Sequence, residues 1–525
     1  MVRKENIEKE KHKLIKFGQN HHHVYIYGAG RYGKIYFDVL QHYGVHVDGF
    51  IITGSGITEY CGCPVYNIKD ITAFITEQDG IIPAYLGSTP EEIMENFDWV
   101  QPDVLGFDHK FISYIKSYME YEMYFSPIMD ELKNKFPVLS LTKDQSWTGW
   151  KDLLVIRLDD LIGDLVCTTA FIRELKLNCP ESTVTVVIRK QNELLLRNCP
   201  YIDKLLLCEG ELSHASFLEG CRNYNEIQAE VSEFASRYFS GRHFDVVFLP
   251  RGALNENIAL QELSLAFYSK AEYRIGHFMD YSNDKTWLYD VVKEYYYCLT
   301  HQTQPQHESL AVLDMLKECG LSVGNDRLEL WPDNTARISA KKIFKQYSIK
   351  GGDKLIAIGL VGSVPAKNWS VDNYNKLISA FYESYGNHYK FVIFGGKDAV
   401  EAASKLIDDT EIVVNLAGKL PLDVTVACME CCDLYVGADT GLMHIATAVD
   451  KPSVTLYRAL DDSSDICGYG PGRWGARRED SIALLPPSGL DGCHIFCRKK
   501  YSHCINQITP FQVRQSIEYI MDKKC

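Results

Sequence analysis

Short apolar segments of the kind that form buried β-strands alternate with helical segments through most of this chain. The alternation begins three times, at VYIYG from residue 24, at DLLVIRL from residue 152 and at LIAIGL from residue 355. Strands that alternate with helices form parallel sheets covered by helices on both faces, so the pattern predicts an α/β protein. Each new start predicts a separate Rossmann-like module.

These starts divide the chain into four parts. We expect a charged N-terminal helix or tail over residues 1–20, a Rossmann-like accessory domain over 21–145, and two larger α/β domains over 150–335 and 340–525. A chain of 525 residues has room for about three domains of ordinary size. The stretch 320–352 is polar and contains Gly and Asp, which predicts a linker between the last two domains.

Charge and hydropathy exclude several classes of function. Fifty-five Lys and Arg against 69 Asp and Glu give a net charge of −14, which repels phosphate backbones, so we expect no nucleic-acid partner. We find no apolar stretch long enough for a transmembrane segment, and the start, MVRKENIEKEKHKLIK, lacks the apolar core of a signal peptide. The 17 cysteines should then be mostly reduced thiols. We therefore expect a cytoplasmic protein.

Three glycines, Gly28, Gly30 and Gly33, follow the first predicted strand in YGAGRYGKIY and open a helix. Glycines in this position permit a tight turn and let backbone N–H groups approach a pyrophosphate at the helix N-terminus. A dinucleotide site also needs an acid at the end of the second strand, but HVDGFIIT ends in Ile52 and Thr53. Two interpretations stay open: nucleotide binding, and close packing of the helix on the strand in a module that holds no redox cofactor.

The second module begins VIRLDDLIGDLVCTTAFIRELK, in which a strand and a glycine turn bring Asp164 to the N-terminus of a helix. Ligands of open α/β folds bind at this end of the sheet, so the carboxylate is a candidate catalytic group. An acid in the first turn of a helix is also a common capping device, so Asp164 alone does not decide between the two roles.

The third module carries three motifs, GLVGSVPAKNW, GGKDAVEAASKL and GADTGLMHIATAV, each after a predicted strand. Their candidate donor-binding residues are Ser363, Lys367, Glu401, Asp439, Thr440, Gly441 and His444. A lysine can meet a diphosphate as a compact positive charge, and the N-terminus of a helix binds anions through its backbone N–H groups. A histidine one turn into such a helix can add a proton or a hydrogen bond, although a single histidine is more often structural.

These motifs, in this order, closely resemble glycosyltransferase family 9, the ADP-heptose:lipopolysaccharide heptosyltransferases. The resemblance covers about residues 153–505 and includes NCPYIDKLLL, PAKNW, NLAGKLPL and GADTGLMHIATAVDKPSVTLY. It implies the GT-B architecture of two facing Rossmann-like domains, in which the first binds the acceptor and the second the nucleotide sugar. The segment ahead of them resembles the small Rossmann-like domains that precede sugar-modifying catalytic domains.

The resemblance also implies roles for single residues. Asp164 matches the family's proposed general base, Lys367 the contact to the diphosphate, and Thr440 with Gly441 the backbone cradle of the leaving phosphate. Asp439 and His444 would line the same pocket. The implied reaction is an inverting, metal-independent transfer, and we find no D-x-D triplet in the sequence.

Two departures from the family pattern concern the donor. Glu401 lies near the position of the family's ribose-binding acid without an unambiguous match, so the nucleotide stays open. YRALDDSSDICGYGPG replaces the usual loop after the last pocket strand, so heptose is implied by the family alone.

The partners that follow are an ADP-heptose-like donor and a glycan, lipid-linked or protein acceptor, in lipopolysaccharide or other cell-surface glycan synthesis. A lipid-linked acceptor would add peripheral contact with a membrane. The alternatives are a protein O-glycosyltransferase of the heptosyl type and a non-catalytic protein that binds nucleotide sugars. An NAD-dependent oxidoreductase would rest on GAGRYG alone, without its ribose acid.

A cysteine group near the C-terminus comprises Cys467, Cys493, Cys497 and Cys504, with histidines interleaved. Thiols at such distances along the chain are able to surround a zinc or iron ion, but they lack the tight C-x₂-C pairs of strong zinc sites. A structural metal and a cluster of buried thiols both stay open. We expect either to stabilise a loop, and we expect catalysis to need no cofactor.

Overall fold

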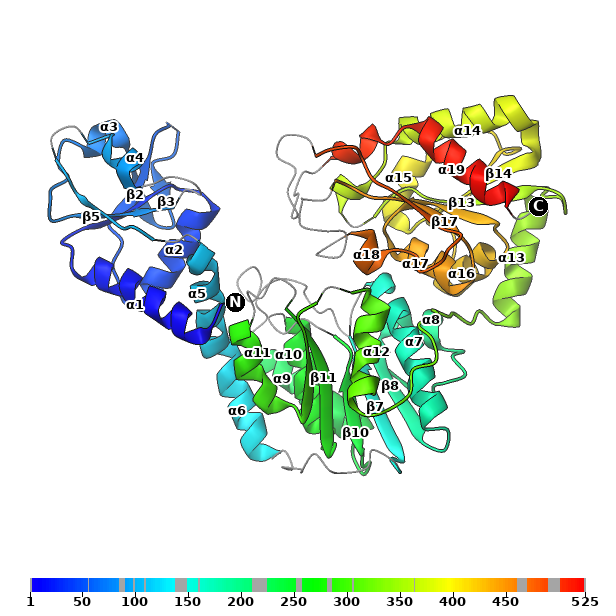
Figure 1. The fold of residues 1–525 in the computed structure, drawn as a ribbon, viewed down its shortest axis with the longest axis horizontal. Coiled ribbons are helices and arrows are strands. Elements are labelled where there is room, and N and C mark those ends of the chain that lie inside the picture. The colour runs from blue at the N-terminus through cyan, green and yellow to red at the C-terminus, as the bar shows by residue number, and fades with distance from the viewer. Residues whose placement is uncertain are drawn as a thin grey trace. The chain divides into compact units, whose positions relative to one another are not determined.

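The chain forms two compact units in a computed structural model (Figure 1). The first contains the residues up to Lys135 together with helix α11 (Thr286–Val292), and the second begins at Phe136 and contains the remaining described residues. The structure describes residues 2–54, 56–84, 90–97, 100–107, 110–136, 149–158, 161–209, 224–251, 257–280, 286–304, 306–362, 364–459, 470–489 and 501–523.

The first unit is built on a six-stranded sheet with the order β3-β4-β2-β1-β5-β6. Its strands are β1 (Val24–Tyr27), β2 (Gly49–Ile52), β3 (Glu59–Tyr60), β4 (Cys63–Asn67), β5 (Gly80–Pro83) and β6 (Asp103–Val104). Its helices besides α11 are α1 (Lys4–Gln19), α2 (Arg31–His42), α3 (Ile68–Ile71), α4 (Pro90–Met94), α5 (Lys110–Glu120) and α6 (Ser126–Lys135). Strand β1 is buried along its whole length and pairs in parallel with β2 and β5, as its apolar sequence predicts.

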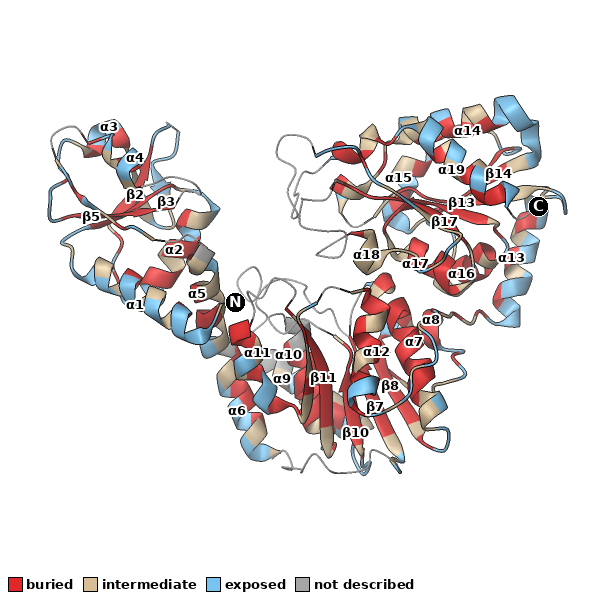
Figure 2. Cartoon of the chain, viewed as in Figure 1, coloured by how far each residue is buried: buried red, intermediate tan, exposed pale blue. Residues whose placement is uncertain are grey.

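Helix α1 is amphipathic and packs on α5. Ile7 and Leu14 are fully buried, whereas most of its charged side chains are exposed (Figure 2). This spacing of one apolar residue every seven positions puts both on one face of the helix. The charged N-terminal segment is therefore folded onto the first unit.

The second unit contains two more six-stranded sheets, both parallel, with the orders β12-β11-β10-β7-β8-β9 and β15-β14-β13-β16-β17-β18. The first has β7 (Asp152–Arg157), β8 (Thr183–Arg189), β9 (Lys204–Cys208), β10 (Val246–Leu249), β11 (Tyr273–Met279) and β12 (Cys298–Gln302). The second has β13 (Lys354–Gly359), β14 (Tyr389–Phe394), β15 (Val413–Asn415), β16 (Leu434–Ala438), β17 (Ser453–Leu456) and β18 (Ile482–Leu484).

Both sheets follow the doubly wound order 3-2-1-4-5-6 when their strands are numbered along the chain. In this topology the winding reverses between strands 1 and 4, and ligands bind in the crevice at the carboxyl ends of those two strands. These switch points are β7 with β10 in one sheet and β13 with β16 in the other.

Helices cover both sheets of this unit. They are α7 (Ile162–Asn178), α8 (Glu193–Leu196), α9 (Tyr224–Tyr238), α10 (Asn257–Tyr268), α12 (Glu308–Glu318), α13 (Asn334–Gln346), α14 (Val371–Tyr385), α15 (Val400–Ala403), α16 (Leu422–Glu430), α17 (Gly441–Ala448), α18 (Pro471–Trp474) and α19 (Pro510–Asp522). One apolar cluster continues from the first of these sheets to the second. It includes Val166 and Cys167 of α7 and Met443 and Ile445 of α17.

A helix lies where the sequence predicted a linker. Helix α13 is capped by Asp333, whose carboxylate accepts a hydrogen bond from the N–H of Ala336 at 2.7 Å. It packs on α16, and Arg337 forms an ion pair with Glu430 at 2.8 Å. The polar composition that indicated a linker belongs to the exposed face of this helix, so the prediction was incomplete.

None of the helices in the described part of the chain is both long and apolar enough to cross a membrane.

Candidate active site

Asp164 lies in the first turn of α7, beyond the carboxyl end of β7. Its side chain is 22% exposed, and its Oδ1 lies 3.3 Å from Nη2 of Arg157, the last residue of β7. Arg157 is buried and also donates a hydrogen bond to the carbonyl of Pro250, just after β10. Arg157 therefore links the two strand ends of the switch point and holds one oxygen of the carboxylate.

Burial raises the pKa of Asp164 to about 6, although the Arg157 guanidinium opposes the shift. The Glu308 carboxylate raises the pKa further, and the Arg473 guanidinium lowers it. At neutral pH the group is mostly ionised but more basic than an ordinary carboxylate, which suits a general base.

Helices α7 and α17 pack directly against each other at their N-terminal turns, and two glycines permit the contact. A Cβ on Gly163 would lie 2.7 Å from Cδ2 of His444, and a Cβ on Gly441 would lie 2.8 Å from Cβ of Ile162. Real Cβ atoms essentially never come that close to other atoms. The acid of α7 and the first residues of α17 therefore belong to one site.

Lys367 and Asp439 lie together at the second switch point. Lys367 ends a short 3₁₀ turn after β13, Asp439 follows β16, and Nζ of Lys367 lies 2.8 Å from Oδ2 of Asp439. The two side chains are only 15% and 8% exposed. The sequence predicted both as donor-binding residues, and the structure brings them into contact.

The loop after β13 also approaches Thr440 closely. A Cβ on Gly362 would lie 2.7 Å from Cγ2 of Thr440, and the Gly362 N–H donates to Oδ1 of Asn368 at 2.8 Å. Thr440 is the N-cap of α17 in extended conformation. The first N–H groups of a helix have no intrahelical partner, so this turn offers donors to an anion.

His444 lies one turn into α17 and is buried. Its Nδ1 lies 3.7 Å from Sγ of Cys167, and its Nε2 lies 3.9 Å from Oδ1 of Asp439. Burial lowers the pKa of His444, although the Asp439 carboxylate opposes the shift. The imidazole is therefore neutral near pH 7 and offers hydrogen bonding rather than positive charge.

Glu401 is placed differently from these residues. It lies on α15, its side chain is 84% exposed, and it pairs with Lys405 one turn further at 2.7 Å. Among the described contacts, none joins it to Lys367 or Asp439.

Ser363 and three of the four clustered cysteines, Cys467, Cys493 and Cys497, lie outside the described residues. Cys504 is buried, and its Sγ accepts a hydrogen bond from the N–H of Ala459 at 3.4 Å. Within the described ranges, no three His, Cys, Asp or Glu side chains are grouped to hold a metal ion.

The glycine loop of the first unit is explained largely by packing. Gly28 has φ +124°, and a Cβ on Gly33 would lie 2.0 Å from the Gly28 carbonyl oxygen, whereas a Cβ on Gly30 would meet nothing within 4 Å. Asp48 precedes β2 and accepts a hydrogen bond at 2.8 Å from the N–H of Val24, at the start of β1. The acid is therefore at the opposite end of the sheet from the glycines.

Sequence reasoning missed three charged residues around Asp164: Arg157, Glu308 and Arg473. Glu308 opens α12, Arg473 lies on α18, and the Nη2 of Arg473 lies 3.1 Å from Oε2 of Glu308. The carboxylate is 3% exposed. Only Arg157 gave a signal, because an arginine that ends an otherwise apolar strand points to a buried charge with a partner.

Residues 290–464 match the sequence profile of glycosyltransferase family 9 (heptosyltransferase). The chain is 24% identical over 320 residues to lipooligosaccharide heptosyltransferase 2 of Haemophilus influenzae, covering 56% of this chain and 80% of that relative. It is 35% identical over 98 residues to lipopolysaccharide heptosyltransferase 2 of Escherichia coli K12, covering 18% of this chain and 27% of that relative.

Two solved structures share the fold. A family 9 glycosyl transferase from Veillonella parvula aligns with a TM-score of 0.58 at 20% identity, over 73% of this chain and 100% of that chain. The E. coli ADP-heptose lps heptosyltransferase II aligns with a TM-score of 0.51 at 16% identity, over 71% and 99%. The predicted family resemblance and the α/β class with GT-B architecture are confirmed.

Proposed function

We propose that this chain, a glycosyltransferase that carries a family 9 domain, moves heptose from ADP-heptose to a hydroxyl group of a lipopolysaccharide-type glycan and inverts the anomeric centre. The names of the relatives support the sugar and the class of acceptor. The residues of the two switch points support the reaction type.

The first half of the reaction is assigned to Asp164. Its carboxylate takes the proton of the acceptor hydroxyl while that oxygen attacks the anomeric carbon from the face opposite the diphosphate. A pKa of about 6 leaves the group ionised at neutral pH and still able to accept a proton. Arg157 orients the carboxylate and limits how far burial raises its pKa.

The second half is the departure of the diphosphate, which leaves with the electrons of the broken C–O bond. We assign Lys367 and the N-terminal turn of α17 to the stabilisation of that negative charge. Asp439 holds the Lys367 ammonium in place at 2.8 Å. With these groups and no D-x-D triplet in the sequence, we infer that the reaction needs no divalent metal.

One observation carries the proposal: the N-terminal turns of α7 and α17 are in contact, with Asp164 on one and the Thr440–Gly441 turn on the other. An inverting transfer needs a base on the acceptor side and charge stabilisation on the donor side within the reach of one sugar ring.

The test is a transfer assay in EDTA-treated buffer with ADP-heptose and lipopolysaccharide that lacks heptose. We expect a product heavier by one heptose in mass spectrometry, with anomeric configuration by NMR opposite to that of the donor. ADP should raise the melting temperature more than GDP or UDP, because ligands that bind only the native state stabilise it. Nucleotide binding without transfer to any acceptor would favour the non-catalytic binding protein, and retention of configuration would refute the inverting mechanism.

A further inference from the structure

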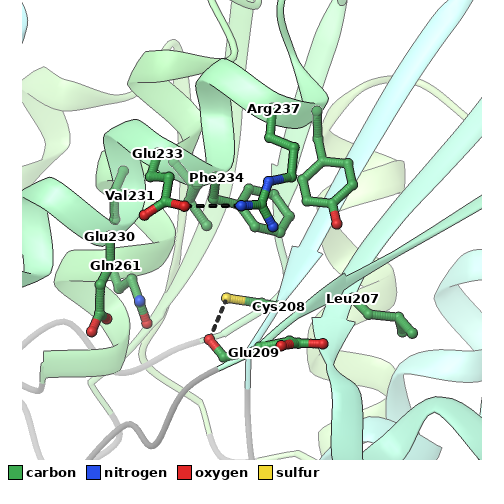
Figure 3. A pocket seen from close by; sticks show the side chains of 11 residues that line it. Leu207, Cys208, Glu209, Glu230, Val231, Glu233, Phe234, Arg237 and Gln261 are labelled. Carbon is green, nitrogen blue, oxygen red and sulfur yellow. Dashed lines mark hydrogen bonds and ion pairs between the residues drawn. The ribbon is translucent and has the colours of Figure 1, made fainter.

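A separate pocket of about 310 Å³ opens at the carboxyl end of β9, between that strand and helices α9 and α10 (Figure 3). Pockets for small ligands begin at about this size. Its walls carry the carboxylates of Glu209, Glu230 and Glu233, the guanidinium of Arg237 and the aromatic ring of Phe234. None of these residues belongs to the reaction proposed above.

The floor of the pocket contains Gln261, which is 2% exposed. Its Oε1 accepts a hydrogen bond at 3.0 Å from Nη2 of Arg189, a buried residue at the end of β8. This contact fixes the amide orientation, and the amide nitrogen has no partner among the described residues. The nitrogen is not sealed from solvent, so a ligand oxygen in the pocket can accept a hydrogen bond from it.

The charges of the pocket select the kind of ligand. Glu233 and Arg237 pair at 2.9 Å on the exposed rim, and Glu209 pairs with Lys190 outside the lining. Together with Lys190 and the buried Arg189, the single lining guanidinium balances the three lining carboxylates, so no net charge draws an ion into the pocket. The buried Arg189 below Gln261 disfavours a cation at the floor.

A neutral ligand with many hydroxyl groups fits what remains. Each hydroxyl can donate to a carboxylate of the wall and accept from the Gln261 amide or Arg237. The C–H face of a sugar ring can pack on the half-buried Phe234 ring. We infer that this pocket binds a neutral sugar residue of the acceptor, an inference that rests on the proposed function.

The position of the pocket agrees with that role. Strand β9 lies two strands from β7 in the same sheet, about 10 Å away at the usual strand spacing, and the carboxyl ends of both point the same way. Next to Gln261 on α10, Glu262 accepts a hydrogen bond at 2.6 Å from the N–H of Leu158, which directly follows Arg157. One helix therefore contacts both the pocket and the strand end beside Asp164, a separation that a short oligosaccharide spans.

The test is saturation-transfer NMR on the full chain with the methyl glycosides of glucose, galactose and mannose, and with glucuronate as the anionic counterpart. We expect at least one neutral glycoside to bind and glucuronate to bind about tenfold more weakly or not at all. Gln261→Leu should weaken the binding of the neutral sugar by about tenfold, since it removes the floor donor. Gln302→Leu is the matched control, because Gln302 is also a buried glutamine, 6% exposed, and lies outside the pocket.

Phe234→Ala, on the half-buried wall, serves as a second variant if Gln261→Leu does not fold by circular dichroism. Binding of none of the neutral glycosides, or equal binding by wild type and both pocket variants, would overturn the inference. The NMR assay measures sugar binding without donor or transfer. A negative binding result together with a positive transfer result would therefore refute this inference and leave the proposed function intact. If the wild-type chain binds the neutral sugar but transfers no heptose, that result would instead contradict the proposed function.

Discussion

The sheet of the first unit and the last sheet of the second unit place a glycine-containing loop after their first strand, yet the two loops differ in what they hold. In the first unit the protein itself contacts the loop: Gly33 packs against the Gly28 carbonyl, and the Tyr60 hydroxyl donates to the Gly30 carbonyl at 3.2 Å. In the second unit, Gly362 lets the loop approach Thr440 beside an ion pair.

A lysine close to each loop shows the same difference. Lys34 pairs with Asp38 one helical turn away at 2.8 Å and is 57% exposed. Lys367 pairs with Asp439, 72 residues further along the chain, at the same distance and is 15% exposed. Surface pairs within a helix are worth little, whereas the buried pair of the second unit holds its charges at a switch point, where ligands of such folds bind. The topology of both sheets leaves a crevice at the carboxyl ends of the central strands. The charged residues at that crevice determine whether it is suited to bind a ligand.

The largest expected effect is that of Asp164→Asn. The variant keeps the shape of the side chain but cannot take a proton, so kcat should fall by about 10²- to 10⁴-fold in an ADP-release assay. Asp48→Asn, the same change at the start of β2, should leave kcat per folded enzyme unchanged. Full activity of Asp164→Asn would mean that this acid only caps its helix.

A smaller effect is expected for Lys367→Met. Loss of a charge-assisted contact to the diphosphate should weaken ADP binding in calorimetry by about 10- to 100-fold. Lys34→Met removes the corresponding lysine of the first unit and should leave ADP affinity unchanged. If Lys34→Met weakens ADP binding and Lys367→Met does not, the nucleotide belongs to the first unit.

The pH profile should follow the ionisation of Asp164. The base works deprotonated and burial raises its pKa to about 6, so kcat/KM should fall about tenfold per pH unit below pH 6 and level off above it. Glu308→Gln removes a neighbouring negative charge that raises this pKa, so the acid limb should move to lower pH. If Asp164→Asn keeps the same acid limb of the pH profile, the limb reports the ionisation of another group.

The smallest effect concerns stability and not catalysis. A Cβ at Gly33 meets backbone at 2.0 Å, so Gly33→Ala should cost about 1–3 kcal/mol. A Cβ at Gly30 meets open space, so Gly30→Ala should change stability by less than about 0.5 kcal/mol. The melting transition of the first unit measures both, and equal losses would show that packing does not explain the loop.

Much of the fold was predictable because buried parallel strands appear in the sequence as apolar runs. The segments VYIYG, DLLVIRL and LIAIGL form β1, β7 and β13. Polar composition concealed α13: its buried residues Ala336, Ala340 and Phe344 recur at helical spacing, but only Phe344 is a large apolar residue.

The motifs pointed to Asp164 and Lys367 but not to the charged residues that surround Asp164. Asp164 and Lys367 follow strands, so topology alone brings each to a switch point. The partners that tune Asp164 come from distant segments: Glu308 and Arg473 are 165 residues apart and meet only in the folded chain. No local pattern pairs such residues, and the burial that raises the pKa of Asp164 depends on the same folding.

The apolar contact between α7 and α17 limits how the two sheets of the second unit can move. Pulling these helices apart would expose residues such as Val166 and Met443, both fully buried, to water. A hinge motion that keeps these side chains buried would turn about this contact as an axis. Points on an axis travel least, so Asp164 and the Thr440–Gly441 turn would keep their spacing while the outer strands move.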